Sequence, residues 1–302
     1  MNIKSKAILL LLLGTIFWGM TFVFIKDAVA LISVASFLGY RFLLAATVLA
    51  LIFAKRLRYF NLEILKAGTL LSIPLLISFV TQTVGLQYTT ASKGGFITGL
   101  SVVFVPLLLA LMQRKFPPIN ILAAILLATT GLCLLTLSSS LYLNTGDVWV
   151  FLCAIAFAIY IIMVGKYSKT HDGVLLTLTQ LFIVGLLSIA YAASTGELNY
   201  PSHYKVWQAI LFTALFATAF MYTVQNYYQK FLSEITTAII FSFEPLFAAI
   251  TAFYYLNEEL TEKTIIGGFL IFVGIVMAEV PSKNLLPEKF FKRAENRVQG
   301  KP

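Results

Sequence analysis

The segment ITTAIIFSFEPLFAAITAFYYLNEELTEKTIIGGFLIFVG, residues 235–274, contains the features that decide how this chain folds. An apolar run carries Glu244 near its centre, and Pro245 follows directly. A polar run at residues 257–261 separates it from a second apolar run, which contains Gly267 near its start. A carboxylate in so apolar a segment needs a cavity or a partner, and a proline removes one backbone hydrogen bond from a helix.

The composition of the whole chain indicates a membrane protein. Of its 302 residues, 59% are hydrophobic and 12% are charged, and the mean hydropathy is +0.89. A soluble domain carries about twice this charged fraction. Apolar runs of roughly 17–22 residues recur, and each is long enough to cross a hydrocarbon core of ~30 Å as a helix. We therefore expect an all-α polytopic membrane protein, since a β-barrel would need alternating polarity in ~10-residue segments.

Ten transmembrane helices are predicted. Their approximate bounds are 7–25, 32–54, 67–86, 94–112, 119–137, 147–164, 174–193, 206–227, 235–255 and 264–280. The first run is too long for the apolar core of a signal peptide and no cleavage pattern follows it, so it is predicted to be a retained helix. The connecting loops are short, which places any function within the membrane.

No motif for an enzyme, a cofactor or a nucleic acid is recognisable. The sequence has no Walker-type glycine loop and no histidine cluster, and both His171 and His203 fall in loops. Cys133 and Cys153 lie within apolar spans and are interpreted as small buried side chains, without the spacing of a metal or disulfide framework. The net charge of +9 is attributed to basic loops rather than to a nucleic-acid partner. We expect no cofactor, no metal and no catalytic residue.

The distribution of Lys and Arg predicts the orientation. With a cytoplasmic N-terminus, seventeen of these residues fall on the inner side and four on the outer side, and Arg41 lies within a span. Basic residues concentrate in cytoplasmic loops. Both termini are therefore predicted to be cytoplasmic, in a protein of the cytoplasmic (inner) membrane.

An internal repeat divides the chain. A shift of 139 residues places FVPLLLA at 104–110 on FEPLFAA at 243–249, and with four extra loop residues Gly131 falls on Gly274. The same shift places Trp18 on Phe157, Thr21 on Tyr160 and Tyr88 on Tyr227. We predict one five-helix repeat at 1–140, a second at 145–280, and a basic cytoplasmic tail at 281–302. Because each repeat has an odd number of spans, the second copy is inverted relative to the first.

The repeat also isolates two charges that the scaffold does not require. Glu244 corresponds to Val105, and Arg41 corresponds to Gln180. The prolines, glycines and aromatic residues recur in both halves, whereas these two charges do not.

Several short motifs are shared with one family of transporters. They are Phe17-Trp18-Gly19, Tyr40-Arg41-Phe42, Gly85-Leu86-Gln87-Tyr88-Thr89-Thr90-Ala91, Pro106, Glu244-Pro245, Glu258, Leu260-Thr261, Gly267 and Gly274. Over residues 7–280 the chain resembles EamA-type transporters of the drug/metabolite transporter superfamily, although Asn257-Glu258-Glu259 departs from the usual Gly-Glu-Pro order. The resemblance implies two inverted five-helix repeats around a central cavity and alternating access. It also implies small organic solutes, often amino acids, that are commonly exported.

Two charges are the leading site candidates. An ionised side chain at the bilayer centre costs about 2.5–3.5 kcal/mol on insertion scales, so it faces a cavity or a partner. Arg41 and Glu244 both lie midway along their spans. They either line the cavity, with Arg41 for a carboxylate and Glu244 for an ammonium or a coupling proton, or form a permanent ion pair that fixes the packing.

Polar and aromatic residues complete the set of candidates. Gln82 lies on a polar face of the third span, and Tyr222 and Gln225 lie on one of the eighth. Such faces point into the bundle, where they line a cavity or form interhelical hydrogen bonds. Trp18 and Tyr160, from the first span of each half, are predicted to border the site, with a packing role as the alternative.

The sequence favours a secondary transporter for a small amphipathic metabolite such as an amino acid, and the family resemblance implies alternating access in the export direction. Multidrug efflux is a rival that predicts binding by aromatic residues. An intramembrane enzyme and a channel are rivals from other classes. Proton coupling, uncoupled facilitation and a homodimer are left open, and the expected partners are a small-molecule substrate and the lipid bilayer.

Overall fold

The computed structural model describes residues 2–89, 91–114, 117–136, 144–256 and 262–279. Over these ranges the secondary structure is helical, without strands. The polar run at 257–261 and the predicted tail at 281–302 lie outside the described residues. The helices are α1 Ile3–Val29, α2 Val34–Ile52, η1 Ala54–Tyr59, α3 Leu62–Tyr88, α4 Ala91–Gly99, α5 Ser101–Gln113, α6 Ile119–Thr136, α7 Thr145–Tyr167, α8 Gly173–Ser194, α9 Tyr204–Phe212, η2 Thr213–Phe220, α10 Met221–Tyr228, η3 Gln229–Phe231, α11 Glu234–Phe241, α12 Glu244–Leu256 and α13 Glu262–Glu279.

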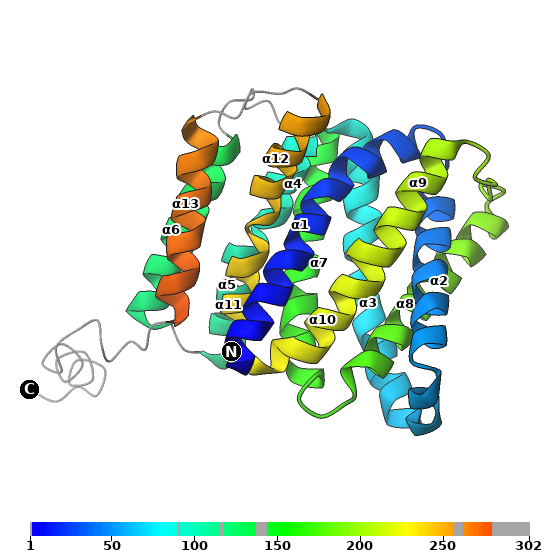
Figure 1. The fold of residues 1–302 in the computed structure, drawn as a ribbon, viewed down its shortest axis with the longest axis horizontal. Helices are drawn as coiled ribbons and strands as arrows, with labels where there is room; N and C mark the ends of the chain where they lie inside the picture. The colour runs from blue at the N-terminus through cyan, green and yellow to red at the C-terminus, as the bar shows by residue number, and fades with distance from the viewer. Residues whose placement is uncertain (1, 90, 115–116, 137–143, 257–261, 280–302) are drawn as a thin grey trace, which may run out of the picture.

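The fold class predicted from the sequence is confirmed: the chain is an all-helical, multi-pass bundle (Figure 1). In the described part, eight helical segments are long and apolar enough to cross a membrane. The fifth and tenth predicted spans are shorter apolar stretches, Ile119–Leu134 in α6 and Ile265–Ala278 in α13. Each of these helices has 18 residues in all, or about 27 Å of helix, against a hydrocarbon core of ~30 Å.

Side-chain caps set where several helices begin. Asn61 accepts from the backbone N–H of Ile64 at the start of α3, and Asn144 forms a capping box with Asp147 at the start of α7. At the start of α11 the Ser233 side chain accepts from the backbone N–H of Thr236. A cap satisfies backbone donors that the first turn of a helix leaves free, so these polar residues fix the helix ends in an otherwise apolar chain.

The spans that carry the two matched prolines are both broken. In the first half, α4 ends at Gly99 and α5 begins at Ser101, with Pro106 five residues later inside α5. In the second half, α11 ends at Phe241 and α12 begins at Glu244, with Pro245 in its first turn. Proline lacks the N–H that would bond the carbonyl four residues earlier, and it is tolerated where a helix begins. The break therefore puts Glu244 at a helix start in mid-span.

The eighth span is also irregular. It runs as α9, then a π-helical segment, η2 at Thr213–Phe220, and then α10. At the end of η2 the N–H of Met221 bonds the carbonyl of Phe216, five residues earlier. π-Helical turns are rare and occur often at functional sites. The shift of 139 residues aligns Thr213, where this segment begins, with Pro74, which lies inside the continuous helix α3.

Reciprocal contacts relate the two halves. A shift of 143 residues carries α6 onto α13, and these two helices pack together at one edge of the bundle, while α2 and α8 pack at the opposite edge (Figure 1). A Cβ added to Gly131 would lie 2.5 Å from the Gly267 carbonyl oxygen, and one added to Gly274 would lie 3.0 Å from that of Ala124. The shift exchanges these two contacts, as a two-fold axis does. The repeat bounds at 140 and 145 stay a prediction.

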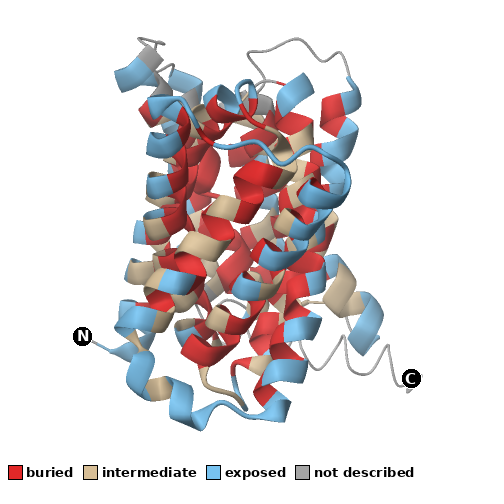
Figure 2. Cartoon of the chain, turned by 90° about the vertical axis from the view of Figure 1, so that its right-hand side faces the viewer, coloured by how far each residue is buried: buried red, intermediate tan, exposed pale blue. Residues whose placement is uncertain are grey.

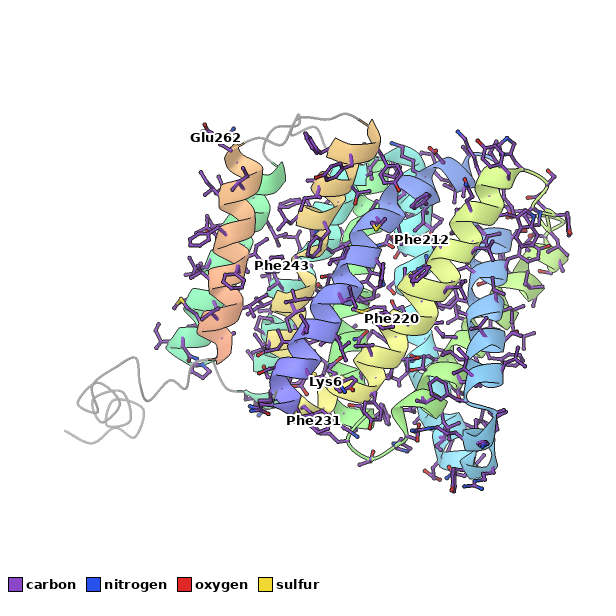
Figure 3. All side chains as sticks on the ribbon, in the orientation of Figure 1. Lys6, Phe212, Phe220, Phe231, Phe243 and Glu262 are labelled. Carbon is purple, nitrogen blue, oxygen red and sulfur yellow. The ribbon has the colours of Figure 1, made fainter. Side chains whose placement is uncertain are left out.

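Buried residues lie inside the bundle and exposed residues lie on its outer surface and at its ends (Figure 2). Large apolar side chains such as Leu51 and Leu111 are exposed, as bilayer-facing positions require, whereas the polar faces predicted on the third and eighth spans are turned inward. Phenylalanines join the first and eighth spans: the Phe17 ring lies 6.3 Å from Phe212 and 5.8 Å from Phe220, both labelled in Figure 3. These contacts hold α1 against the irregular span.

Candidate functional site

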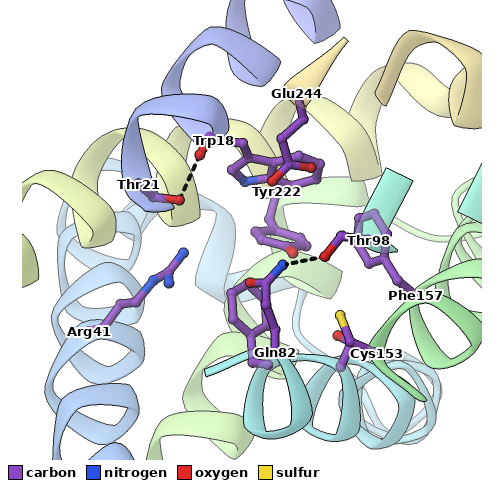
Figure 4. A pocket seen from close by; sticks show the side chains of 11 residues that line it. Trp18, Thr21, Arg41, Gln82, Thr98, Cys153, Phe157, Tyr222 and Glu244 are labelled. Carbon is purple, nitrogen blue, oxygen red and sulfur yellow. Dashed lines mark hydrogen bonds between the residues drawn. The ribbon is translucent and has the colours of Figure 1, made fainter. Parts of the chain in front are cut away.

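A cavity lies between the helices at the level of the broken ninth span. Side chains of α1, α2, α3, α4, α7, α10 and α12 line it. They are Trp18, Thr21, Arg41, Ser78, Phe79, Gln82, Thr98, Cys153, Phe157, Tyr222 and Glu244. Figure 4 shows Arg41, Gln82 and Glu244 reaching toward the same space from three sides. The cavity thus combines both charges with polar and aromatic walls.

Arg41 is held in the cavity wall and forms no ion pair within 4.0 Å among the described residues. Its side chain is 1% exposed, and its Nε–H donates to the Thr218 hydroxyl at 2.8 Å. The guanidinium lies over the Phe79 ring, 4.7 Å from the ring centre. The Nη1 nitrogen is buried and has no hydrogen-bond partner. A buried cation with an unused donor is costly, so this group is poised to bind an acceptor that enters the cavity.

Glu244 faces the same space from the first position of α12. It is 5% exposed, and no hydrogen bond or ion pair to its carboxylate is found within the described residues. A carboxylate at a helix N-terminus is favoured by the helix dipole. Gly19 allows α1 to approach at this point, since a Cβ there would lie 2.8 Å from the Glu244 carbonyl oxygen. Charge, helix break and close packing coincide at one residue.

The two charges do not neutralise each other. Across the described part of the chain, the ion pairs within 4.0 Å involve other residues, and none joins Arg41 to Glu244. The alternative of a closed, permanent ion pair is therefore not the arrangement in this structure.

The remaining polar wall consists of uncharged groups. The Gln82 amide donates to the Thr98 hydroxyl at 3.2 Å, which links α3 to α4 across the cavity. The Thr21 hydroxyl donates to the Trp18 carbonyl oxygen. The Cys153 thiol lies on the α7 side, and its side chain is 2% exposed. These groups supply donors and acceptors without adding charge.

An aromatic layer forms the other part of the wall. Trp18 lies 5.5 Å from Phe157, 5.6 Å from Tyr222 and 4.9 Å from Phe241, measured between ring centres. The Trp18 Nε1–H donates to the Ala217 carbonyl oxygen at 2.7 Å, inside the π-helical segment. Offset and edge-to-face aromatic pairs are favourable beyond their area, and the hydrogen bond fixes the indole, so this layer is rigid.

Five of the seven residues selected from the sequence come together in this cavity, namely Trp18, Arg41, Gln82, Tyr222 and Glu244. Tyr160 and Gln225 are not brought to its wall. The Tyr160 ring packs 5.7 Å from that of Tyr222, and its hydroxyl accepts from Asn226 at 3.2 Å. Gln225 of α10 donates to Gln229 of η3 at 3.0 Å, and Gln229 in turn donates to the Ile161 carbonyl oxygen of α7.

Sequence reasoning missed part of the wall: Thr21, Ser78, Phe79, Thr98, Cys153 and Phe157. The repeat contained a signal for two of them. Residue Phe157 is the counterpart of Trp18 at a shift of 139, and Thr21 is the counterpart of Tyr160. Both members of the matched pair Trp18 and Phe157 line the cavity. Of the matched pair Thr21 and Tyr160, Thr21 lines it and Tyr160 does not.

The cavity is contracted in this structure. It offers about 30 Å³ of space, which is room for about one water molecule. Small-molecule sites usually have ~300–1,000 Å³. A metabolite therefore needs the walls to separate before it can enter.

Comparison with known proteins identifies the family. The model of the EamA-like transporter family matches the chain twice, at residues 5–137 and 144–279. This chain belongs to the EamA-like transporter family. The resemblance inferred from the motifs is thereby confirmed, and the repeated helical fold with it.

Relatives of this EamA-like protein carry transporter names. It is 31% identical to an uncharacterised transporter of Archaeoglobus fulgidus over 89% of this chain and 84% of that protein. It is 28% identical to the uncharacterised transporter YyaM of Bacillus subtilis, over 91% of this chain and 94% of that protein. A WAT1-related chloroplast protein of Arabidopsis thaliana is 29% identical over 66% of this chain and 51% of its own length.

A solved structure shares the fold. It superposes with a TM-score of 0.76 over 94% of this chain and 99% of the other, at 13% identity. Together with the family match and the apolar helices, this makes the EamA-like chain a multi-pass membrane protein of a transporter family.

Proposed function

We propose that this EamA-like protein is a secondary transporter that exports a small zwitterionic metabolite, such as an amino acid, by alternating access. The observation that carries the proposal is that Arg41 and Glu244 face one buried cavity without pairing to each other. An amino acid presents a carboxylate and an ammonium group, which complement a guanidinium and a carboxylate.

The cost of the two charges supports a functional role. A charge at mid-membrane costs about 2.5–3.5 kcal/mol even on insertion scales. The second repeat folds with Gln180 where the first has Arg41, and the first folds with Val105 where the second has Glu244. The fold tolerates neutral residues at both positions, so the charges are expected to act on a solute.

The contracted cavity supports alternating access. Space of about 30 Å³ is too small for an amino acid, so the site must open toward one side of the membrane and then toward the other. Inverted repeats provide two related conformations around a midplane site. The broken spans α4–α5 and α11–α12 border the cavity and are the elements expected to move.

Counterflow in proteoliposomes tests the proposal. The purified protein is loaded with one unlabelled amino acid at a time, and uptake of its labelled form is measured. Arg41→Gln is expected to reduce counterflow about 10- to 100-fold, because it removes a charged hydrogen bond worth ~1.5–3 kcal/mol. Glu244→Gln is expected to act similarly. Arg58→Gln and Glu63→Gln repeat the same changes at exposed positions and should transport normally.

Two results would contradict the proposal. One is normal counterflow in both cavity variants, and the other is the absence of counterflow for every amino acid in the parent protein.

Coupling is measured in the same vesicles: if Glu244 carries a coupling proton, a pH gradient drives accumulation by the parent, and Glu244→Gln transports only down the solute gradient. Flux that is indifferent to the pH gradient in the parent identifies a facilitator.

Multidrug efflux is the second candidate, and the aromatic wall favours it. Trp18, Phe79, Phe157 and Tyr222 offer faces for an apolar or aromatic solute. In that case Trp18→Ala abolishes efflux of a fluorescent drug, while Arg41→Gln leaves it intact. An intramembrane enzyme is less well supported, because the side chains that hydrogen-bond the Cys153 thiol are the hydroxyls of Thr81 and Thr98, which are not general bases.

The proposed location is the cytoplasmic membrane, with both termini on the cytoplasmic side. The support is the excess of Lys and Arg in the loops on that side. Single cysteines introduced at Lys4 and at Lys205, in a chain without native cysteines, test the orientation with an impermeant thiol reagent. Only the second is expected to react in intact cells.

A further inference from the structure

A second and larger cavity lies on the other side of α3 from the candidate site. It has a volume of about 690 Å³ and is lined by α3, α8 and the start of α2. On α3 its wall is formed by Leu76, Val80, Val84 and Gln87, which repeat at the spacing of one helix face. Phe79 and Gln82, which line the central cavity, belong to a different face. The groove is therefore separate from the transport site.

The packing of α3 against α8 explains why the groove exists. Near the start of α3 the two helices touch, because a Cβ on Gly68 would lie 2.5 Å from the side chain of Thr179. Further along, the groove separates Val80 and Val84 from Leu187 and Tyr191 of α8. Leu187 and Tyr191 are exposed, so the groove opens to the outside of the bundle, the side that faces lipid in a multi-pass membrane protein.

The length of the groove matches one leaflet. Leu76 lies at the middle of α3 and Gln87 near its end, eleven residues later. Eleven residues of helix rise about 16 Å, and half of a hydrocarbon core is ~15 Å. Apart from Ser188, whose hydroxyl donates to the Val184 carbonyl oxygen of its own helix, the wall is apolar from Leu76 to Val84 and becomes polar at Gln87, Ser33 and Glu197. This is the polarity profile of a single phospholipid.

The polar end of the groove is a built structure. The hydroxyls of Ser33 and Ser36 donate to the Glu197 carbonyl oxygen at 2.7 and 2.9 Å. The Ser33 N–H donates to the Asn199 side chain, and the Asn199 N–H donates back to the Ser36 hydroxyl. These bonds hold the loop after α8 against the start of α2, so the rim keeps its shape when the groove is occupied.

The charge at the rim selects the headgroup. The exposed Glu197 carboxylate has no ion pair within the described residues, and no cationic side chain lines the groove. We infer that this groove binds a phosphatidylethanolamine molecule of the leaflet opposite the N-terminus, with an acyl chain between α3 and α8 and the primary ammonium beside Glu197. An ammonium complements the carboxylate, whereas an anionic headgroup is repelled.

Photo-crosslinking with defined lipids tests the assignment. The full-length protein is placed in nanodiscs that contain phosphatidylethanolamine or phosphatidylglycerol with a diazirine on the acyl chain, and labelled peptides are located by mass spectrometry. The ethanolamine lipid is expected to label the 76–87 and 187–191 segments several times more than the glycerol lipid does. Glu197→Gln should reduce this preference roughly three- to fivefold, the range of a surface ion pair.

A variant in which a large side chain fills the groove is the control for lipid binding at this site. Val84→Trp is expected to abolish labelling of both segments, whereas Val148→Trp, the same change at an exposed position of α7, leaves it unchanged. Equal labelling of the parent by the two lipids would overturn the headgroup assignment. Labelling of the groove no stronger than that of the exposed face of α6 would overturn the lipid site. Protein–protein crosslinks through Leu187 would show a second copy there instead, which also overturns it.

Discussion

The Nε–H of Arg41 on α2 donates to the hydroxyl of Thr218, which lies in the π-helical segment of the eighth span. This bond, 2.8 Å long, joins a helix of the first half to an irregular turn of the second. It is the one side-chain hydrogen bond of Arg41 recorded in the described structure, so Thr218 sets where the guanidinium lies.

Replacement of Thr218 by valine keeps the side-chain shape and removes the acceptor. We expect Thr218→Val to lower the free energy of unfolding by about 1–3 kcal/mol, the cost of an unsatisfied buried group. Thermal unfolding in detergent measures the effect. Thr47→Val is the matched control, because the Thr47 hydroxyl bonds its own helix at the exposed surface. Equal shifts in the two variants would contradict a special role for Thr218.

The bond from Trp18 to Ala217 gives a second prediction. Trp18→Phe keeps an aromatic ring among Phe157, Tyr222 and Phe241 but removes the Nε1–H donor. The expected loss of stability is about 1 kcal/mol or slightly more, since the carbonyl oxygen stays buried. Trp207→Phe, at a position 38% exposed, serves as the control in the same unfolding assay. An unchanged melting temperature for Trp18→Phe would show that the bond is dispensable.

The seam between α6 and α13 depends on the absence of a side chain. Gly131→Ala would place a Cβ 2.5 Å from the Gly267 carbonyl oxygen, so the helices must separate. Overpacking of this kind typically costs about 1–3 kcal/mol. In Gly95→Ala the new Cβ meets Phe22 at an ordinary 3.7 Å. We expect the first variant to unfold at a lower temperature than the parent, while the second unfolds at the parent temperature or above. The reverse order would refute the tight seam.

Cys153 can report on access to the cavity. In a Cys133→Ser background, a small methanethiosulfonate reagent is expected to modify Cys153 slowly, because its side chain is 2% exposed in the contracted state. A transported solute should alter the rate, since the thiol lines the same cavity. Mass spectrometry of the labelled protein gives the rate. A rate that no solute and no pH gradient changes would argue against the cavity as the binding site.

Asp172 has two separable roles at the start of α8. It accepts from the N–H groups of Val174 and Leu175, and it pairs with Arg56 at 2.6 Å. Asp172→Asn keeps a good cap and loses the pair, which is partly exposed, so we expect a cost of at most about 1 kcal/mol. Asp172→Ala loses both, and the cap adds about 1 kcal/mol. Thermal unfolding at low and high salt separates the roles, because only the ion pair is screened.

Sequence reasoning reached the charged part of the site. Arg41 and Glu244 stand out because an ionised residue in an apolar span must face inward, and inward-facing residues at mid-span converge in a bundle. Gln82 and Tyr222 were found by the same argument from polar faces. Tyr160 and Gln225 satisfy the rule equally well, yet the Tyr160 hydroxyl accepts from Asn226 of α10 and the Gln225 amide donates to Gln229 four residues later, away from the cavity. Periodicity shows that a side chain points inward and cannot show what it meets there.

Other parts of the wall carry no polar signal of their own. Phe79 and Phe157 are two of 26 phenylalanines, and no composition argument separates them from the core. The π-helical segment also escapes detection, because it contains neither proline nor glycine to mark the irregular turn. The break before Glu244, in contrast, is signalled by Pro245, although the sequence leaves its exact register open.

The unequal charges of the two halves have an energetic consequence. In a chain of two identical inverted halves, the two conformations that exchange under the two-fold axis would have equal free energies and equal populations. Here Arg41 stands against Gln180 and Glu244 against Val105. A difference of ~1.4 kcal/mol is enough for a tenfold ratio of populations. The two residues that we propose to contact the solute are thus also expected to bias which of the two conformations the empty protein adopts.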